Sequence, residues 1–254
     1  MKKKVMIIIA IFLSSTIYSY ENIYFGIGDD SFKSIRFMKG NKVEFLNDDA
    51  DGQEPFWNQV YNYSISELSS FYVLNLSKET KKYDLLILVS YSYLVVYEKN
   101  SDIIFYGTSK KGTERFYEIS KIKGSSELEE SGKRYAAQNL CTLRSDFPWV
   151  EAANGCGIGE YLDFSINASE IIVFLGYVSI KNPDLYRYNC RPRVVEIEFL
   201  KTHEKKIFEL EDTPNPQSLQ LGQLYNDDVR LKILDVYKGD KYDDLCINSI
   251  MLKY

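Results

Sequence analysis

Residues 83–97 read YDLLILVSYSYLVVY, a nearly continuous run of Leu, Ile, Val and Tyr. Side chains of these types suit a pleated and buried surface. A turn signal follows at residues 99–101, and a second apolar run occupies residues 103–106 before Gly107. This order predicts a β-hairpin in which the long run pairs with the short one, and it is the strongest hairpin signal in the N-terminal half.

Weaker strand signals lie on the N-terminal side of that hairpin. Short apolar runs at residues 35–37 and 43–46 flank Lys39-Gly40-Asn41, which is a turn sequence. Further along, apolar and polar residues alternate over residues 61–65 and, less cleanly, over residues 71–76. The first block is therefore predicted to be a small antiparallel β-meander or barrel of about 100 residues. These residues give no indication of its role.

The composition of the whole chain agrees with a β-rich globular protein. It has 254 residues, of which 45% are hydrophobic and 15% aromatic, with 21 Tyr and 14 Phe. This excludes wholesale disorder and collagen-like repeats, and the length predicts one large or two modest domains.

The chain is acidic, with a formal net charge of −5. Residues 124–254 hold 15 basic and 21 acidic side chains, a net charge of −6, whereas residues 21–123 are at −2. A nucleic-acid partner is not expected, because the basic surface that neutralises phosphates is missing. Anionic membranes and acidic polymers should be repelled.

The N-terminus is typical of a secretory signal. Three lysines precede the apolar run at residues 5–13, and a small polar stretch follows it. Nine apolar residues extend only about 14 Å as a helix, so no transmembrane segment is expected after cleavage near Ser19. Because no Cys lies near that position, we expect an exported protein that is not a lipoprotein, in the periplasm, on the cell surface or outside the cell. An uncleaved anchor that extends through Tyr20 is the alternative.

A charged segment that contains Gly and Ser, residues 121–133, has little to bury and predicts a domain boundary near Lys123. We therefore divide the chain into a signal peptide at 1–19, a β domain at 20–123 and a second domain at 124–254. Seven strand candidates in the second domain are separated by turn clusters, which is typical of a β-sandwich. They are residues 159–164, 170–177, 194–200, 206–210, 218–221, 229–237 and 246–252.

All four cysteines, Cys141, Cys156, Cys190 and Cys246, lie in the second domain. An even number in an exported chain permits one or two disulfides, and the sequence leaves the pairing open. None of the spacings is a CxxC or a zinc-ligand pattern.

Several ordered motifs in residues 124–254 point to a known family. Residues 135–140 read YAAQNL, 149–151 read WVE, 155–161 read GCGIGEY and 186–191 read YRYNCR, and the match continues through 236–247, VYKGDKYDDLCI. This series resembles discoidin-like modules of the coagulation factor 5/8 type C kind, which are galactose-binding-like jelly rolls. It resembles still more closely the bacterial NADase-type glycan-binding domains.

The resemblance implies a jelly-roll sandwich that binds a carbohydrate with the loops at one end and has no catalytic role. One departure is that Leu140 is followed by Cys141-Thr142 instead of the Asp-Gly usual in discoidin modules, which argues against a cation site on that loop. No metal and no cofactor are expected.

Candidate ligand-binding residues are those that could supply an aromatic plate and polar groups to a sugar. Asn189 and Arg191 are two residues apart and would point to one side of a strand. Trp149 and Tyr177 are equally well explained as core residues, and Arg191 as a structural partner of an acid such as Glu151 or Glu160. The full candidate set is Trp149, Glu151, Tyr177, Tyr186, Asn189 and Arg191.

Other patterns are interpreted as structural. Gly155, Gly157 and Gly159 precede a strand pattern instead of a helix, so they indicate a tight turn and not a phosphate loop. Residues 47–52 repeat only the first half of a calcium loop, and Asp243-Asp244 suits turn chemistry. His203, the only histidine, is predicted at a hairpin tip, and no catalytic residues are assigned.

The sequence therefore predicts an exported, non-catalytic carbohydrate-binding protein. The first alternative is a structural or protein-interaction module of the bacterial cell envelope with the same fold and no sugar ligand. The second is an enzyme whose catalytic part is the first block, and the lack of His and Cys in residues 21–123 argues against it.

Overall fold

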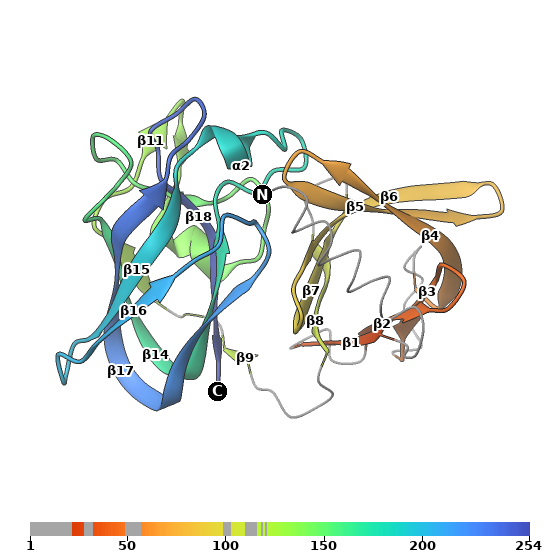
Figure 1. The fold of residues 1–254 in the computed structure, drawn as a ribbon, viewed down its shortest axis with the longest axis horizontal. Coiled ribbons are helices and arrows are strands. Elements are labelled where there is room, and N and C mark those ends of the chain that lie inside the picture. The colour runs from red at the N-terminus through yellow and green to blue at the C-terminus, as the bar shows by residue number, and fades with distance from the viewer. Residues whose placement is uncertain are drawn as a thin grey trace.

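The computed structural model describes residues 22–27, 33–48, 57–98, 103–109, 116–117, 119 and 121–254. Within these residues the chain is nearly all β and forms two units, a closed barrel and a sandwich, which lie side by side (Figure 1). The predicted all-β fold is confirmed. The signal segment at 1–19 and most of the calcium-like pattern, from Asp49 onward, lie outside the described residues.

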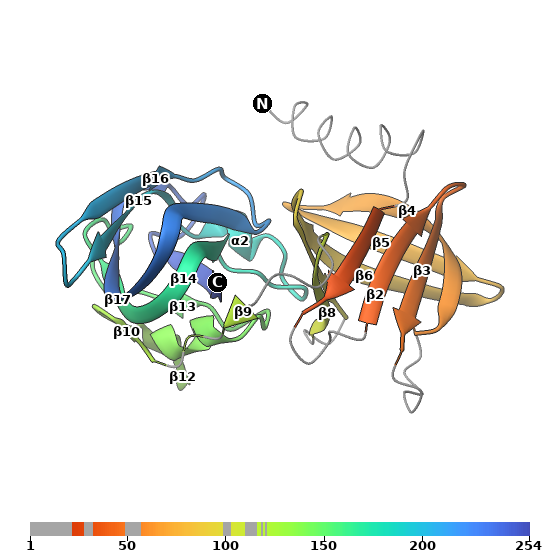
Figure 2. The same ribbon diagram turned by 90° about the horizontal axis from the view of Figure 1, so that it is seen from below.

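The first unit is an antiparallel barrel in which each strand pairs with the next and β1 pairs with β8 to close it (Figure 2). Its strands are β1 (Asn22–Gly26), β2 (Lys33–Met38), β3 (Lys42–Asn47), β4 (Gln59–Leu68), β5 (Phe71–Lys78), β6 (Lys81–Val89), β7 (Tyr93–Tyr97) and β8 (Ile103–Thr108). Of the two predicted arrangements, meander or barrel, the barrel is the one observed.

The turn between β2 and β3 forms as its residues predict. Gly40 and Asn41 adopt φ values of 74° and 54°. Glycine and asparagine accept this left-handed conformation at the lowest cost, so they reverse the chain between the paired strands.

The sequence suggested that residues 83–97 form one long strand, but the structure divides them into two. The run divides into β6 and β7 at residues 90–92, and the Ser90 backbone N–H bonds to the Tyr93 carbonyl at 2.9 Å. The predicted pairing of β7 with the apolar run after it is confirmed, with Tyr97 opposite Ile103. Ser90 and Ser92 are the local signal for the turn, because serine favours turns over strand interiors.

The continuous apolar character of β6 and β7 has a structural cause. Side chains that point into the barrel, such as Leu85 and Val96, join the barrel core. Those that point outward, such as Leu88 and Val95, join the core of the sandwich. Strands buried on both faces lack apolar–polar alternation, and this is the pattern at residues 83–97.

The second unit carries the remaining elements. They are β9 (Phe116–Tyr117), β10 (Ile122–Gly124), β11 (Glu129–Glu130), β12 (Lys133–Arg134), the 3₁₀ helix η3 (Ala137–Cys141), β13 (Trp149–Val150), β14 (Tyr161–Leu175), α2 (Leu185–Tyr188), β15 (Arg191–Phe199), β16 (Lys205–Glu209), β17 (Gln217–Tyr237) and β18 (Cys246–Lys253). The main sheet has the order β13-β18-β14-β17-β15-β16.

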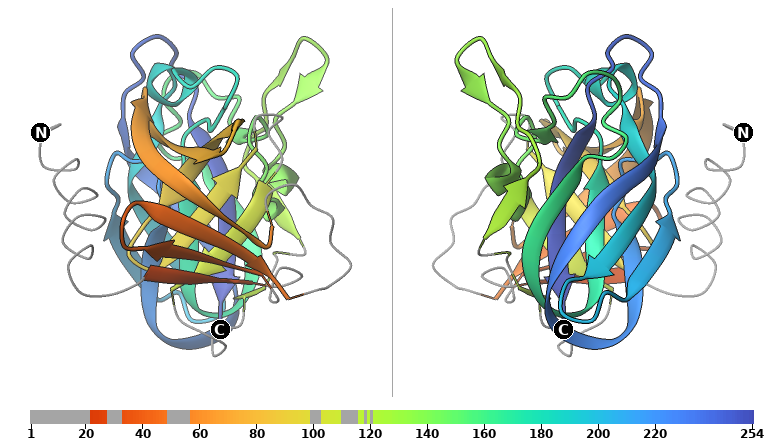
Figure 3. Two further views of the ribbon diagram at one scale, coloured as in Figure 1. Left: turned by 90° about the vertical axis from the view of Figure 1, so that its right-hand side faces the viewer. Right: turned by 90° about the vertical axis from the view of Figure 1, so that its left-hand side faces the viewer.

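Two long curved strands, β14 and β17, make this sheet into a sandwich (Figure 3). The first part of β14 pairs with β10 and the last part with β18, and its register shifts between Ala168 and Glu170. Such an irregularity bends a strand, which lets one strand run through both layers.

The same two strands correct the predicted element boundaries. The candidates at 159–164 and 170–177 belong to one strand, β14, and those at 218–221 and 229–237 belong to β17. The polar cluster at 226–228, interpreted as a turn, lies within β17 and pairs with residues 165–167. The β-sandwich itself is confirmed.

The sequence places the domain boundary near Lys123, but the sheet of the second unit begins earlier in the chain. Lys123 lies inside β10 and pairs with Asp163 of β14. Phe116 in β9 already pairs with Lys253 of β18. These two short strands therefore belong to the sheet of the second unit.

Among the described residues, no helix has the length and apolar character needed to cross a membrane.

Candidate functional site

Several connections gather at one end of the sandwich, at the top in Figure 1, where α2 and β11 are labelled. Strand pairing places the ends of β13, β14, β15, β17 and β18 there: Val150 lies opposite Cys246, Leu175 opposite Ile247, and Arg191 opposite Tyr237. We call this the loop end. It carries the β11–β12 hairpin and the segments 142–148, 151–160, 176–190 and 238–245.

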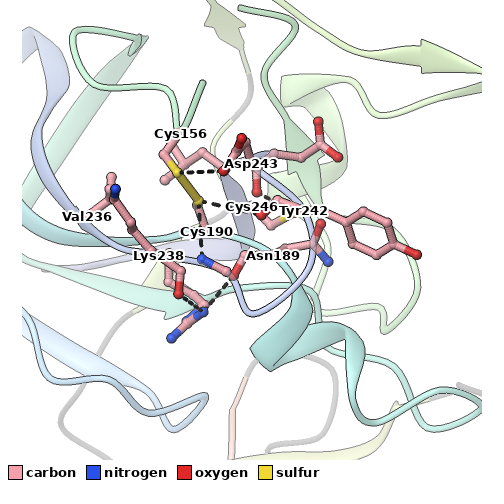
Figure 4. Close-up of a disulfide and its surroundings, with 12 residues drawn as sticks. Cys156, Asn189, Cys190, Val236, Lys238, Tyr242, Asp243 and Cys246 are labelled. Carbon is pink, nitrogen blue, oxygen red and sulfur yellow. Dashed lines mark hydrogen bonds between the residues drawn. A yellow bond between two sulfur atoms is a disulfide. The ribbon is translucent and has the colours of Figure 1, made fainter. Parts of the chain in front are cut away.

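A disulfide between Cys156 and Cys190 ties two of these segments together (Figure 4). The bridge selects one of the pairings that the sequence left open, and Cys246 remains a buried thiol whose pKa is raised by burial. Asp243 Oδ1 lies 3.7 Å from Cys156 Sγ. The two sulfurs and Asp243 would suit a metal ion by distance alone, but the disulfide uses both sulfurs.

The three glycines of residues 155–159 form the turn that precedes β14. Their φ values are 94°, 68° and 96° for Gly155, Gly157 and Gly159. A Cβ on Gly157 would lie 2.9 Å from both Glu151 Cγ and Leu245 Cβ. A strand follows instead of a helix, so the tight-turn interpretation is confirmed and a phosphate cradle is not formed.

Trp149 is a core residue in this structure. It is completely buried in β13, and its indole N–H donates to the Ser126 carbonyl at 2.9 Å. The ring therefore has no exposed face to offer a sugar, in accord with the core interpretation of this residue.

Glu151 is buried as well and braces two loops. Its carboxylate accepts the backbone N–H of Leu245 at 3.1 Å and that of Ala153 at 2.5 Å. Burial raises the pKa of Glu151, although both backbone hydrogen bonds lower it. This carboxylate holds segment 151–160 against segment 238–245.

Tyr186 and Arg191 share a single acidic partner, Asp212. The guanidinium donates to both carboxylate oxygens, at 3.0 and 2.7 Å, and the Tyr186 hydroxyl donates to Asp212 Oδ1 at 3.1 Å. The Arg191 side chain is only 6% exposed, and it also donates to the Asn189 carbonyl at 2.6 Å. Neither of the acids considered from the sequence, Glu151 and Glu160, is its partner in these contacts.

Asn189 is also buried, and its side-chain amide donates to the Leu185 carbonyl at 2.7 Å, closing the short helix α2. The structure thus brings Tyr186, Asn189 and Arg191 together as an internal brace of segment 176–190. It places Trp149 and Glu151 elsewhere, in and beside β13.

Tyr177 is the one candidate that keeps part of its surface exposed, and it belongs to a different group. Lys133 Nζ donates to the Tyr177 hydroxyl at 3.1 Å and to the Asp146 carbonyl at 2.6 Å. The same ammonium lies 4.6, 5.0 and 5.6 Å from the ring centres of Tyr135, Phe147 and Tyr177. We call Lys133, Tyr135, Phe147 and Tyr177 the Lys133 cluster.

Backbone hydrogen bonds hold the Lys133 cluster in place. The Asp146 N–H bonds to the Val178 carbonyl at 2.8 Å, which joins segment 142–148 to segment 176–190. The Val150 N–H bonds to the Tyr135 carbonyl at 3.2 Å, which fixes Tyr135 beside β13. The rings of Tyr135 and Tyr177 meet edge to face, with centres 6.1 Å apart.

The charges in the Lys133 cluster are tuned by its surroundings. Burial lowers the pKa of Lys133, the Asp146 carboxylate raises it, and the positive charge of Lys181 lowers it. Burial, followed by the hydrogen bond with Tyr135, raises the pKa of Tyr177, so its hydroxyl stays protonated at neutral pH. The cluster therefore offers hydroxyl and ammonium donors beside partly exposed rings.

The sequence did not assign Lys133, Tyr135 or Phe147 to the site. A usable signal existed for two of them, because Tyr135 opens the first quoted motif and Phe147-Pro148 directly precede Trp149. Lys133 ended a segment interpreted as a charged linker, and nothing in its own neighbourhood indicated that rings would surround it.

A second aromatic group lies on the loop end. The rings of Tyr188 and Tyr242 meet edge to face at 6.2 Å, and Lys241 Nζ lies 4.8 Å from the Tyr242 ring centre. We call Tyr188, Lys241 and Tyr242 the Tyr242 group.

His203 lies at the tip of the β15–β16 hairpin with φ 58° and 77% of its side chain exposed, as predicted. Because β15 starts at the loop end and finishes at this hairpin, the histidine is far from both aromatic groups.

No curated protein sequence matches the chain. Among solved structures, the chain is similar to the arabinofuranosyltransferase AftD from Mycobacteria, with 11% identity, a TM-score of 0.38 and coverage of 57% of this chain but only 12% of the transferase. It is also similar to the CBM32-2 module of a GH31 protein bound to GalNAc, with 14% identity, a TM-score of 0.34 and coverage of 56% of this chain and 99% of the module. The third is a two-domain esterase active on acetylated mannans, with 10% identity, a TM-score of 0.32 and coverage of 56% and 36%. These TM-scores are too low for the likeness to carry an argument about function.

A family model gives the stronger result. The model described as "NAD glycohydrolase translocation F5/8 type C domain" matches residues 115–253. These residues start at β9 and include almost all of the second sheet, and they confirm the resemblance read from the motifs. Because the matched residues make up more than half of the chain, this chain belongs to the NAD glycohydrolase translocation F5/8 type C domain family.

Proposed function

We propose that this chain is an exported, non-catalytic carbohydrate-binding protein that holds its glycan at the Lys133 cluster. The family gives the coarser statement, a carbohydrate-binding or translocation-related module. The observation that carries the finer proposal is the gathering of three partly exposed rings around one ammonium at the loop end.

The chemistry of sugars favours this cluster over the buried candidates. A pyranose presents a face of C–H groups that packs on an aromatic ring, and hydroxyls around its edge that need hydrogen-bond partners. Tyr135 and Phe147 supply rings, and Tyr177 and Lys133 supply polar atoms. Trp149, Glu151, Tyr186, Asn189 and Arg191 then act indirectly, because they fix the loops on which the cluster stands.

Binding without catalysis follows from the same arrangement. The carboxylates of Glu151 and Asp212 are engaged in structural hydrogen bonds, and the histidine lies at the opposite end of the sandwich. A general acid or base must lie within reach of the bound substrate, and the hydrogen bonds of these two carboxylates are made to residues outside the Lys133 cluster.

The test is a glycan array probed with the full chain and with Phe147→Ala and Tyr242→Ala variants. The full chain is preferred to an isolated second unit because side chains on the outside of the barrel belong to the core of the sandwich. We expect at least one glycan to bind, Phe147→Ala to weaken it by at least about tenfold, and Tyr242→Ala to leave it unchanged. Circular dichroism of both variants is the control that checks whether they are folded.

A second candidate is a protein-contact module, in keeping with the translocation named in the family description. The observation that favours it is apolar exposure on two joined loops: Ile158 is 63% and Tyr242 is 38% exposed. Failure of the folded full chain to bind any glycan, together with a stoichiometric protein partner lost in Tyr242→Ala, would replace the first proposal with this one.

A further inference from the structure

Two further cations lie near the Lys133 cluster, in a unit that is acidic overall. Residues 124–254 carry a net charge of −6. Arg144 stands over the Phe147 ring with its guanidinium carbon 4.4 Å from the ring centre. Lys181, on the neighbouring segment, is close enough for its charge to act on Lys133. Lys133 and Arg144 thus lie over the same aromatic ring, and the charge of Lys181 acts on Lys133.

These cations differ from three arginines at the loop end, each of which forms an ion pair with a carboxylate. Arg134, Arg187 and Arg191 are paired with Glu127, Asp240 and Asp212, each at 2.7 Å. By contrast, Lys133, Arg144 and Lys181 form no ion pair with any carboxylate in the part of the chain that the structure describes.

One acidic side chain, Asp146, acts on this group, and its charge raises the pKa of Lys133. Its single negative charge stands against the three positive charges of Lys133, Arg144 and Lys181. The hydrogen bond from the Lys133 ammonium goes to the Asp146 backbone carbonyl, which is neutral.

The ammonium of Lys133 also has capacity to spare. It has three N–H donors, and the two hydrogen bonds to Asp146 and Tyr177 use two of them. Arg144 and Lys181 are exposed, so their donors face water. An unpaired, partly desolvated cation attracts an anion more strongly than a fully hydrated one.

We infer that the glycan recognised at the Lys133 cluster is a negatively charged saccharide, whose anionic group lies among Lys133, Arg144 and Lys181 while its ring packs on Phe147 or Tyr135. This inference rests on the proposed function and narrows its ligand class. The net charge of the unit predicts that acidic polymers are repelled, and this inference reverses that expectation at the Lys133 cluster. Salt screens the distant negative charges of the unit, whereas the three nearby cations attract a bound anion with little screening.

The experiment compares oligosaccharides of the same length and linkage that end in glucose, in glucuronate and in 6-sulfated glucose, titrated into the full chain at low salt. A charge-assisted hydrogen bond corresponds to about a tenfold change in Kd, and we expect the charged sugars to bind at least that much more tightly than the neutral one. The glucuronate and sulfate arms show which anionic group is preferred. At 1 M salt, where the screening length is about 3 Å, the preference should shrink.

The variants are Lys181→Ala and Arg144→Gln, singly and together, with Lys82→Ala as the matched control. Lys82 is an exposed lysine on the barrel strand β6, so its removal makes the same change in net charge as each single variant, away from the loop end. We expect the double variant to lose most of the preference for charged sugars while binding of the neutral sugar persists, and Lys82→Ala to behave as the unmodified chain does.

Equal affinity for the neutral and charged sugars, with binding still dependent on Phe147, would overturn this inference and leave the proposed function intact. A preference that survives in the double variant would overturn it as well. Absence of binding to every sugar by the folded chain would overturn the proposed function and this inference with it.

Discussion

At the scale of single residues, burial decides which of the aromatic and charged candidates can contact a ligand. Residue type does not determine burial. Trp149 and Tyr177 looked equivalent in the sequence, yet the first is completely buried and the second contacts Lys133 at a partly exposed surface. A core position is one interpretation of both residues, and the structure supports it for Trp149. A one-dimensional pattern could not separate them, because the exposure of a loop residue is set by neighbouring loops.

Arg191 illustrates the same limit. The sequence indicated a structural carboxylate partner as one interpretation, and the partner is Asp212, which lies in a turn between β16 and β17. Asp212 is 21 residues from Arg191 in the sequence, and the fold brings the two side chains, together with Tyr186, into hydrogen-bond contact.

Removing Asp212 should lower the stability of the fold more than removing Arg191 does. The Arg191 side chain is 6% exposed and that of Asp212 is 37% exposed. Asp212→Ala leaves a buried guanidinium without its carboxylate and should cost about 3 kcal/mol. Arg191→Met leaves a carboxylate that water can reach and should cost less. Chemical denaturation of both variants measures the difference, and a larger loss in Arg191→Met would contradict this account.

At the scale of elements, strands were predicted well where apolar residues dominate and poorly where the structure bends. The hairpin of β2 and β3 was located correctly because Gly40 and Asn41 carry a conformational signal. Residues 226–228 were interpreted as a turn because of their polarity, but they lie within β17 and pair with residues 165–167 in regular register. Asn226 and Asp228 are exposed and Asp227 is buried. Local polarity alone cannot distinguish a polar stretch within a strand from a turn between strands.

The turn at residues 155–159 offers a test at this scale. Alanine at Gly155 or Gly157 must adopt a positive φ, which costs about 1 kcal/mol. At Gly155 a Cβ meets nothing within 4 Å, but at Gly157 it would collide with Glu151 and Leu245. We therefore expect Gly157→Ala to lower the thermal midpoint more than Gly155→Ala and to weaken glycan binding through movement of Glu151. Equal midpoints for the two variants would argue against this packing.

At the scale of the whole molecule, outward-facing side chains of the barrel belong to the core of the sandwich, while the barrel interior forms a second core. Phe71 of β5 packs edge to face on Tyr186, with ring centres 6.0 Å apart, which links the barrel to the loop end. The Val89 N–H donates to Asn215 Oδ1 at 3.0 Å. The apolar run at residues 83–97 contained the signal for burial on both faces, but it could not reveal what covers the outer face.

Glu170 is the charged group at this junction, and it predicts a pH dependence. It accepts the Tyr93 hydroxyl of the barrel at 3.0 Å and pairs with Lys253 at 3.0 Å. Burial disfavours its ionised form, but hydrogen bonds from Ser218, Lys253 and Gln220 hold its pKa below the ordinary value of 4.5.

Because the pKa of Glu170 is lower in the folded chain, its contribution to stability is present above about pH 4.5 and is lost as the pH falls through the folded value. We expect Glu170→Gln to be less stable than the unmodified chain at neutral pH, with the difference narrowing in acid. Glu209→Gln, at an exposed position on β16, is the control and should show no such narrowing. A constant difference across this range would contradict the assignment.

The central claim is that a glycan binds at the Lys133 cluster, and hydrogen–deuterium exchange of the full chain with and without the best glycan from the array tests it most directly. The account predicts slower exchange on binding in segments 133–147 and 176–181, with no change at the His203 hairpin or in the barrel strands β2 and β3. Protection confined to segment 238–245 or to the barrel, with the cluster unaffected, would contradict it.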